Sequence, residues 1–224
     1  MTRRPKIVFL DVMGTLFDLA PIEDHLVAAG LPPALWNPWF TRTLRDGFAL
    51  AAAGTFAPFK EVASAALAGL ATDMGHKIDP QKLATVVGGL AEMPAHPDVR
   101  ESFDLLRAAN IPIVLFSNSG VESMRKLITG AGLADYPQAL VSIDEPRAWK
   151  PRPESYRFAL ERVETAAADA AMVASHTWDC HGAKQVGMTA AWVRRRESYP
   201  NPVMAAPDVS GDNLIAVVRQ LLEA

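Results

Sequence analysis

The stretch PKIVFLDVMGTL, residues 5–16, decides the fold of this 224-residue chain. Its first half, residues 5–10, is a short run rich in β-branched and aromatic side chains, which is typical of a buried strand. Asp11 ends the run and Gly14 follows, so the strand leads into a turn that carries a carboxylate. A strand that is apolar on both faces belongs in a parallel sheet with helices on each side.

Four later apolar runs repeat this pattern, and helical patterns separate them. Val99, Phe103 and Leu106 recur at helical spacing, and the last helix is expected after Ser210 as its N-cap. Strands that alternate with helices predict an α/β fold with a doubly wound parallel sheet. The expected strands are residues 5–10, 111–116, 139–143, 171–174 and 189–193.

Residues 18–97 interrupt the alternation, because they are rich in alanine and contain no convincing strand. A helical insert after the first strand explains this better than a second independent domain. The aromatic side chains of the insert either form its own core or line a pocket between the insert and the sheet. The expected helices cover residues 21–30, 34–53, 58–73 and 80–92.

Composition excludes several classes of protein. Lys and Arg total 22 against 25 Asp and Glu, so the net charge is −3 and no nucleic-acid partner is expected. The single cysteine, Cys180, excludes an intrachain disulfide and a cysteine zinc cluster, and it suits the cytoplasm. No segment approaches the roughly 20 apolar residues of a membrane span, so no membrane partner is expected.

Four polar clusters follow predicted strands along the chain. Ligands of doubly wound sheets bind beyond the carboxyl ends of the strands, so these clusters are expected to meet. Together they supply a carboxylate nucleophile, a hydroxyl and amide anion site, a cation and a second carboxylate. The clusters are residues 11–16 (DVMGTL), 117–120 (SNSG), 150–151 (KP) and 175–179 (SHTWD).

The motifs DVMGTL, SNSG, WKPRPESY and SHTWDCHGAKQVGM resemble, in order and spacing, those of the haloacid dehalogenase superfamily. The chain is most similar to the type II (S)-2-haloacid dehalogenase branch. The resemblance implies a Rossmann-like core of residues 1–17 and 98–224, with residues 18–97 as a helical cap. It also implies a hydrolase that cleaves the carbon–halogen bond of short 2-haloacids without a metal or other cofactor. Members are commonly homodimers, so a homodimer is one option here.

The resemblance implies a role for each polar cluster. Asp11 would displace the halide and form an ester with the substrate, and Asp179 would activate the water that hydrolyses this ester. Lys150 would pair with Asp11 and keep it ionised. Thr15, Ser117 and nearby backbone amides would bind the charge of the substrate or transition state.

The same resemblance assigns further residues to binding of the substrate or halide. Asn118 would help to hold the halide, while Phe40 and Phe59 would form an apolar wall. Tyr156 matches a tyrosine of the family's site, with packing on a helix face as the alternative. The full set is Asn118, Arg42, Phe40, Phe59, Tyr156, Ser175, His176 and Trp178.

Two positions depart from the family's pattern. The family holds the substrate with a cap arginine, but Phe40 stands at that place in this chain. Arg42 is the nearest replacement, and Arg45 is better explained as a solvated surface charge. His176 stands where the family often has asparagine, and it either assists water activation or is a neutral residue behind the site.

Met13 bears on the type of reaction. Phosphatases of the superfamily carry an aspartate two residues after the nucleophile, and it protonates the leaving alkoxide. Met13 cannot donate a proton, whereas a halide leaves without one. Two alternatives stay open: a Mg²⁺-dependent phosphatase-like hydrolase that uses Asp11 and Asp179, and a catalytically weak relative that binds a small acid.

Overall fold

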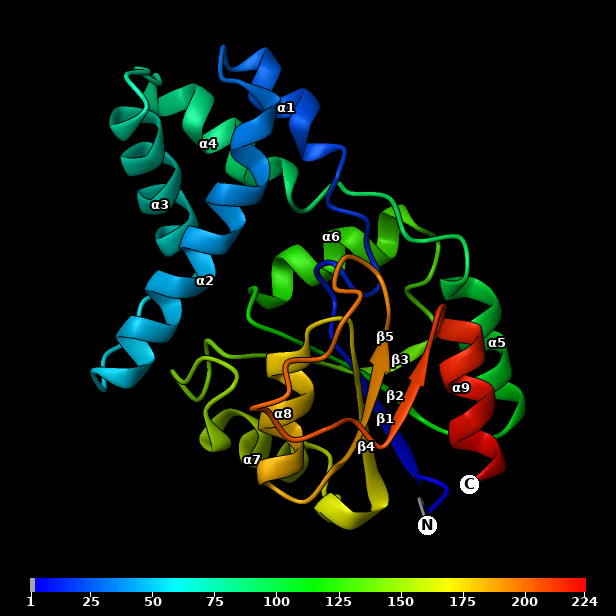
Figure 1. Cartoon of the computed structure of the whole chain (residues 1–224). Helices are drawn as coiled ribbons and strands as arrows, with labels where there is room; N and C mark the ends of the chain where they lie inside the picture. Colours follow the sequence, from blue (N-terminus) through cyan, green and yellow to red (C-terminus); the bar gives the residue numbers. More distant parts are fainter. Residues whose placement is uncertain (1–2) are drawn as a thin grey trace.

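The computed structural model describes residues 3–224 and shows a parallel sheet at one end of the molecule and a group of helices at the other (Figure 1). Six strands lie in the order β3-β2-β1-β4-β5-β6, and every neighbouring pair is parallel. This arrangement confirms the predicted α/β fold with a Rossmann-like doubly wound sheet. The strands are β1 (Ile7–Leu10), β2 (Ile113–Ser117), β3 (Pro137–Ser142), β4 (Ala170–Ala174), β5 (Thr189–Val193) and β6 (Val209–Gly211).

β1 lies between β2 and β4, and all of its residues are buried. Its last residue, Leu10, is level with Leu115 of β2 and with Val173 of β4. The chain segments that follow these three strands therefore leave the sheet at the same edge. Asp11, the next residue after β1, is thereby placed beside the ends of both neighbouring strands.

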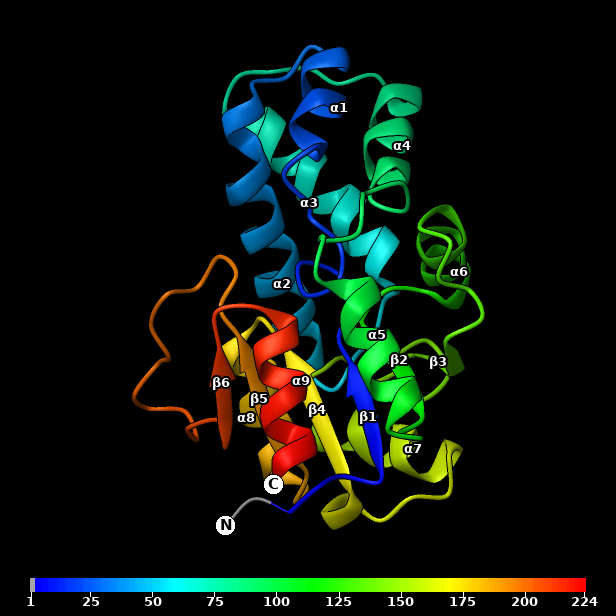
Figure 2. The ribbon, with the colours of Figure 1, turned by 90° about the vertical axis from the view of Figure 1, so that its right-hand side faces the viewer.

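Helices cover both faces of the sheet, as its apolar strands require. On one face α5 (Val99–Ala108) packs against α9 (Leu214–Glu223) (Figure 2). On the other face α7 (Pro153–Arg162) packs against α8 (Thr177–Gln185). α6 (Val121–Gly130) packs beside β3 at the edge of the sheet.

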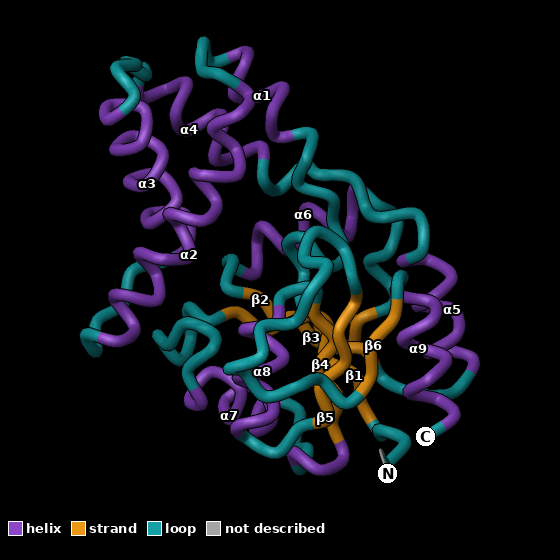
Figure 3. Tube along the Cα trace, in the orientation of Figure 1, coloured by secondary structure: helices purple, strands orange, loops and turns teal. Residues whose placement is uncertain are grey.

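Four α-helices make up most of the cap, residues 18–97, and they stand apart from the sheet (Figure 3). They lie close to the predicted ranges, whereas the division of the chain at residues 18 and 97 stays a prediction. Trp39 ties two of them together, because its indole N–H donates to the carbonyl oxygen of Ala63 at 2.8 Å. Across residues 3–224, no helix is both long and apolar enough to cross a membrane. The cap helices are α1 (Ile22–Ala28), α2 (Trp36–Ala52), α3 (Phe59–Asp73) and α4 (Pro80–Gly89).

Two features of the C-terminal part differ from the predictions. β6 was not expected, because three residues with a polar one in the middle give no recognisable strand pattern. Ser210 lies in this strand and does not cap the last helix. Asn213 is the N-cap of α9, and its side-chain oxygen accepts a hydrogen bond from the backbone N–H of Ala216 at 2.8 Å.

Candidate active site

Lys150 joins the polar clusters that meet at the carboxyl edge of the sheet. Its ammonium lies 3.0 Å from Oδ1 of Asp11 and 2.6 Å from Oδ2 of Asp179, and it also donates to the carbonyl oxygen of Phe116 at 2.9 Å. Burial alone would lower the pKa of Lys150, but the two carboxylates outweigh burial and raise it. The side chain is therefore a buried cation between two acidic groups, as predicted for its pairing with Asp11.

Thr15 holds the second oxygen of the Asp11 carboxylate. Its hydroxyl donates to Oδ2 of Asp11 at 2.7 Å and accepts from the backbone N–H of Ser175 at 2.8 Å. The turn between them depends on Gly14, whose φ of +79° is a left-handed conformation. A Cβ at this position would also lie 3.2 Å from Nε2 of His176. Thr15 of the DVMGTL motif thus holds Oδ2 of Asp11, and Lys150 holds Oδ1, before any ligand binds.

Asp179 is held entirely within the core. Its Oδ2 accepts from Lys150, and its Oδ1 accepts from the hydroxyl of Tyr156 at 2.6 Å. Burial and Asp179 raise the pKa of Tyr156, so this hydroxyl keeps its proton and donates. Burial also raises the pKa of Asp179, against the opposing effect of Lys150. Asp179 and Tyr156 therefore help to fix Lys150, and the side chain of Asp179 is fully buried.

A small cavity of about 20 Å³ opens at Asp11, with room for about one water molecule. It brings together seven of the predicted site residues, whereas Thr15, Lys150, Tyr156 and Asp179 are buried residues that do not line it. Core and cap both contribute to its wall. The lining residues are Asp11, Met13, Phe40, Leu44, Phe59, Ser117, Asn118, Ser119, His176 and Trp178.

The SNSG segment is ordered by its own hydrogen bonds. Oδ1 of Asn118 accepts from the backbone N–H of Lys150 at 2.9 Å, so this amide positions the lysine segment as well as lining the cavity. The hydroxyls of Ser117 and Ser119 lie 2.9 Å apart. The three residues of the predicted anion site are thus held by hydrogen bonds and line the same cavity as Asp11, whereas anion binding there stays a prediction.

His176 reaches toward Asp11 from the segment between β4 and α8. Its Nε2 lies 3.2 Å from the carbonyl oxygen of Met13 and 4.0 Å from Oδ2 of Asp11. Its Nδ1 lies 3.7 Å from Oε1 of Glu197, and its ring stacks on Trp178 at 5.3 Å. Both ring nitrogens therefore face hydrogen-bond acceptors, which favours the doubly protonated imidazolium.

Glu197 is a site residue that the sequence did not reveal. It follows β5 in the run RRRESYP, and its Oε2 accepts from the backbone N–H of Thr177 at 3.0 Å. Burial alone would lower the pKa of His176, but Glu197 and Asp11 outweigh burial and raise it. The signal that was available is the position of Glu197 after a strand of the same sheet edge.

An outer pocket of about 600 Å³ lies next to the small cavity. Its predicted members are Phe40, Ser175, His176 and Trp178, and Phe40, His176 and Trp178 also line the inner cavity. Two arginines also line it, Arg45 from the cap and Arg196 from the core. Glu197 lines the same pocket, so the outer pocket brings two guanidinium groups and one carboxylate next to His176. 

Arg42 does not reach either of these pockets. Its guanidinium pairs with Asp73 of α3 at 2.6 Å, and it lines a different hollow of the cap. The prediction that Arg42 replaces the cap arginine is therefore not supported by the geometry. Arg45 pairs with Asp46 and is 65% exposed, as expected for a surface charge, yet it is the cap arginine that borders the site.

The aromatic side chains of the cap serve both of the roles considered from sequence. Trp39 is buried inside the cap. Phe48 packs edge-on against Trp178 of the core at 5.1 Å, and Phe59 lies 5.8 Å from Trp149. These contacts across the two parts of the molecule shape the wall of the site.

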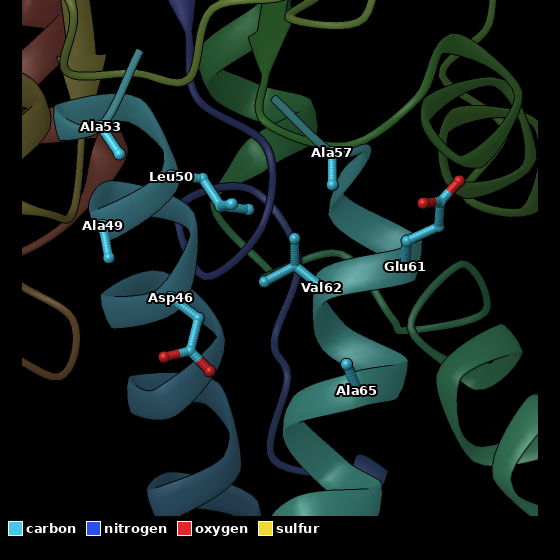
Figure 4. A pocket seen from close by; sticks show the side chains of 8 residues that line it. All are labelled: Asp46, Ala49, Leu50, Ala53, Ala57, Glu61, Val62 and Ala65. Carbon is cyan, nitrogen blue, oxygen red and sulfur yellow. The ribbon is translucent and has the colours of Figure 1, made fainter. Parts of the chain in front are cut away.

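A separate hollow of about 530 Å³ lies between α2 and α3 (Figure 4). It shares no lining residue with the cavity at Asp11 or with the outer pocket. Small apolar side chains dominate it, so it has no visible part in the chemistry. The lining residues are Asp46, Ala49, Leu50, Ala53, Ala57, Glu61, Val62 and Ala65.

Known proteins match this chain in sequence and in fold. A family model of haloacid dehalogenase-like hydrolases matches residues 5–187. The (S)-2-haloacid dehalogenase of Xanthobacter autotrophicus is 30% identical over 192 residues, which cover 85% of this chain and 75% of that protein. The (S)-2-haloacid dehalogenase 1 of Pseudomonas sp. (strain CBS-3) is 25% identical over 214 residues, which cover 95% of this chain and 94% of that protein.

A solved structure extends the match to the whole fold. The L-2-haloacid dehalogenase from Xanthobacter autotrophicus with chloropropionic acid covalently bound has a TM-score of 0.90 to this chain at 25% identity. The match covers 97% of this chain and 98% of that one. The family model spans both the sheet edge that carries Asp11 and the cap above it. From these matches we conclude that this chain belongs to the haloacid dehalogenase-like hydrolases.

Proposed function

We propose that this protein hydrolyses the carbon–halogen bond of short 2-haloacids through an ester formed on Asp11. The observation that carries the proposal is the Asp11 carboxylate at the cavity, held by Lys150 and Thr15, with Met13 where a phosphatase needs an acid. The relatives named above are 2-haloacid dehalogenases, which supports the same substrate class.

In the first step an oxygen of Asp11 attacks C2 of the substrate. The new carbon–oxygen bond forms as the carbon–halogen bond breaks, and the halide leaves with the electron pair of that bond. Because a halide is a weak base, it needs no proton, and Met13 has none to give. The buried ammonium of Lys150 pairs with the Asp11 carboxylate and orients it for this attack.

The substrate anion meets separate groups on its way to Asp11. Arg45 and Arg196 in the outer pocket attract it electrostatically. At the cavity, the hydroxyls of Ser117 and Ser119 and nearby amides can bind its carboxylate or the departing halide. The apolar wall that includes Phe40 excludes water around the reacting atoms.

In the second step water attacks the side-chain carbon of the Asp11 ester and releases a 2-hydroxy acid. This step breaks no bond at C2, so the configuration at C2 is inverted only once, during the first step. An (S)-2-haloacid therefore yields an (R)-2-hydroxy acid. Chiral analysis of the product checks this point.

No step of this reaction requires a metal or other cofactor. The Lys150 ammonium already lies between Asp11 and Asp179, where a divalent cation shared by these carboxylates would have to displace it. We therefore propose that activity is independent of added metal. A homodimer in the cytoplasm remains an expectation, and light scattering after gel filtration tests the oligomeric state.

The decisive experiment is a halide-release screen against chloroacetate, fluoroacetate and both enantiomers of 2-chloropropionate, with and without EDTA. We expect release from at least one 2-haloacid, a preference for one enantiomer, and no effect of EDTA. Phosphate release from a phosphate ester with Mg²⁺, in the absence of halide release, would overturn the proposal. Thermal stabilisation by haloacids without turnover would instead indicate a small-acid-binding relative.

A further inference from the structure

Hydrolysis of the Asp11 ester, a step that rests on the proposed function, needs a base that can reach the attacking water. Asp179 is poorly placed for this task. Its Oδ2 accepts from Lys150 and its Oδ1 from Tyr156, and its side chain is 0% exposed. Asp179 is also not among the residues that line the cavity at Asp11. The base must therefore be sought among the residues that line the cavity.

Within residues 3–224, the cavity at Asp11 has two titratable side chains in its lining, Asp11 itself and His176. The other lining residues are apolar or carry neutral hydroxyl or amide groups. Asp11 is consumed by the ester and cannot serve as the base for its own release. His176 is thus the proton acceptor that shares the space with the ester.

We propose that His176, positioned by Glu197, is the general base that activates water for hydrolysis of the Asp11 ester. Nε2 of His176 lies 4.0 Å from Oδ2 of Asp11, a separation that one water molecule can bridge. The cavity has room for about one water molecule. Glu197 lies 3.7 Å from Nδ1 and is itself fixed by the backbone N–H of Thr177. The imidazole of His176 therefore lies between Asp11 and Glu197, with the carbonyl oxygen of Met13 3.2 Å from Nε2.

The proton and electron transfers of this step balance. The water oxygen bonds to the side-chain carbon of Asp11, and one water proton passes to Nε2 of His176. The bond from this carbon to the substrate oxygen then breaks, and the departing alkoxide takes the proton back from His176. Asp11 is left as a carboxylic acid that ionises, so each turnover releases one proton to solvent.

The charges around His176 fit a base that is needed only after the first step. In the free enzyme, the negative charges of Asp11 and Glu197 and the Met13 carbonyl near Nε2 favour the imidazolium. Formation of the ester removes the charge of Asp11, so the ring then loses its proton more readily. Arg45 and Arg196, which line the outer pocket with His176, act in the same direction.

Rapid-mixing kinetics on 2-chloropropionate with His176→Asn tests the proposal. This variant should release a burst of halide equivalent to the enzyme, followed by turnover that is about 10²- to 10⁴-fold slower than wild type. Its peptide containing DVMGTL should gain the mass of a carboxyethyl group at Asp11. His176→Gln should behave alike if His176→Asn folds poorly, and added imidazole should speed ester hydrolysis in His176→Ala.

Two further variants separate the base from its neighbours. Glu197→Gln keeps the imidazole but removes a negative charge, so kcat should fall less and should reach its plateau at lower pH. Asp179→Asn should slow the halide burst itself without accumulation of ester, because Lys150 loses one of its two counter-charges.

The outcomes distinguish this inference from the proposed function. Absence of halide from the wild type with every 2-haloacid overturns both. Wild-type turnover together with full activity of His176→Asn overturns this inference alone. The same holds if ester accumulates in Asp179→Asn and not in His176→Asn, because Asp179 would then be the base.

Discussion

The core and the cap form opposite walls of the cavity at Asp11, and the two walls differ in chemistry. The core wall carries the reacting carboxylate above the buried ion pair of Lys150 with Asp179. The cap wall consists of Phe40, Leu44 and Phe59. The comparison indicates that the core supplies the reacting and charged groups, whereas the cap supplies shape and keeps water away.

The charges of the cap act outside the cavity. Arg42 forms an ion pair with Asp73 on the neighbouring helix, and Arg45 lines the outer pocket but not the cavity at Asp11. This differs from the family pattern, in which a cap arginine holds the substrate. The positive charge that offsets the substrate anion next to Asp11 must then come from the core, where Lys150 and His176 lie.

Removal of the nucleophile from the core wall should have the largest effect. Asp11→Asn should reduce halide release below detection, because a neutral amide is a poor nucleophile. Phe40→Leu on the cap wall should retain turnover with a changed KM. Steady-state halide assays on both variants check this contrast, and normal turnover by Asp11→Asn would break it.

Loss of the buried cation should be the largest effect on stability. Lys150→Met leaves Asp11 and Asp179 buried together without a counter-charge, so the free energy of unfolding should fall by about 3–5 kcal/mol. Lys82→Met on the exposed side of α4 is the control and should change it by less than about 0.5 kcal/mol. Urea unfolding followed by circular dichroism gives both values. Similar losses in the two variants would show that the core ion pair does not hold the site together.

His176 should make a smaller contribution that depends on pH. Its pKa is raised in the folded protein by Glu197 and Asp11 against the effect of burial, so its charged form stabilises the fold. This contribution should be complete below the unfolded pKa of about 6.5 and should be lost as pH rises through the folded pKa. Unfolding free energies of wild type and His176→Asn should therefore converge with rising pH. If the difference in unfolding free energy between the two proteins instead grew with pH, the neutral form of the His176 ring would be the stabilising one.

Substitutions of the two cap arginines should have the smallest effects, and they test whether the charges of the cap act only outside the cavity. Arg45→Ala should lower kcat/KM a few-fold at low salt, and the loss should fade at high salt because the interaction is long-range. Arg42→Ala should leave kcat/KM unchanged, since Asp73 holds that guanidinium away from the site. If Arg42→Ala lowered kcat/KM more than Arg45→Ala did, Arg42 would be the cap arginine that contacts the substrate.

The sheet and the cap helices could be predicted because each leaves a pattern in the sequence. A buried strand such as β1 is a continuous apolar run, and parallel strands carry their polar clusters to one edge. β6 was not predicted because its three residues are too few to show a strand pattern, and it forms a strand only by pairing with β5. Likewise, Asn213 competes with Ser210 as a cap, and only the end of β6 decides between them.

Two features of the candidate site could not be predicted from the sequence: which cap arginine borders the site, and the presence of Glu197. Arg42 and Arg45 are three residues apart on α2, nearly one turn, so periodicity cannot say which one faces the site. The choice depends on Asp73, which a different helix supplies. Glu197 was missed for a similar reason, because its partner His176 lies 21 residues away in sequence, beyond a helix and a strand. Tertiary packing decides which side chains from distant elements contact a site residue, so a local sequence pattern does not predict such contacts.

The wall shared by the inner cavity and the outer pocket also has a kinetic consequence. Phe40 and Leu44 of the cap meet His176 and Trp178 of the core there. The space behind them, about 20 Å³, is too small for a haloacid, so these side chains must separate before a substrate can reach Asp11. Halide and hydroxy acid must leave through the same passage. We therefore expect saturated turnover to slow in viscous solvent, as in enzymes whose rate is set by opening and not by chemistry.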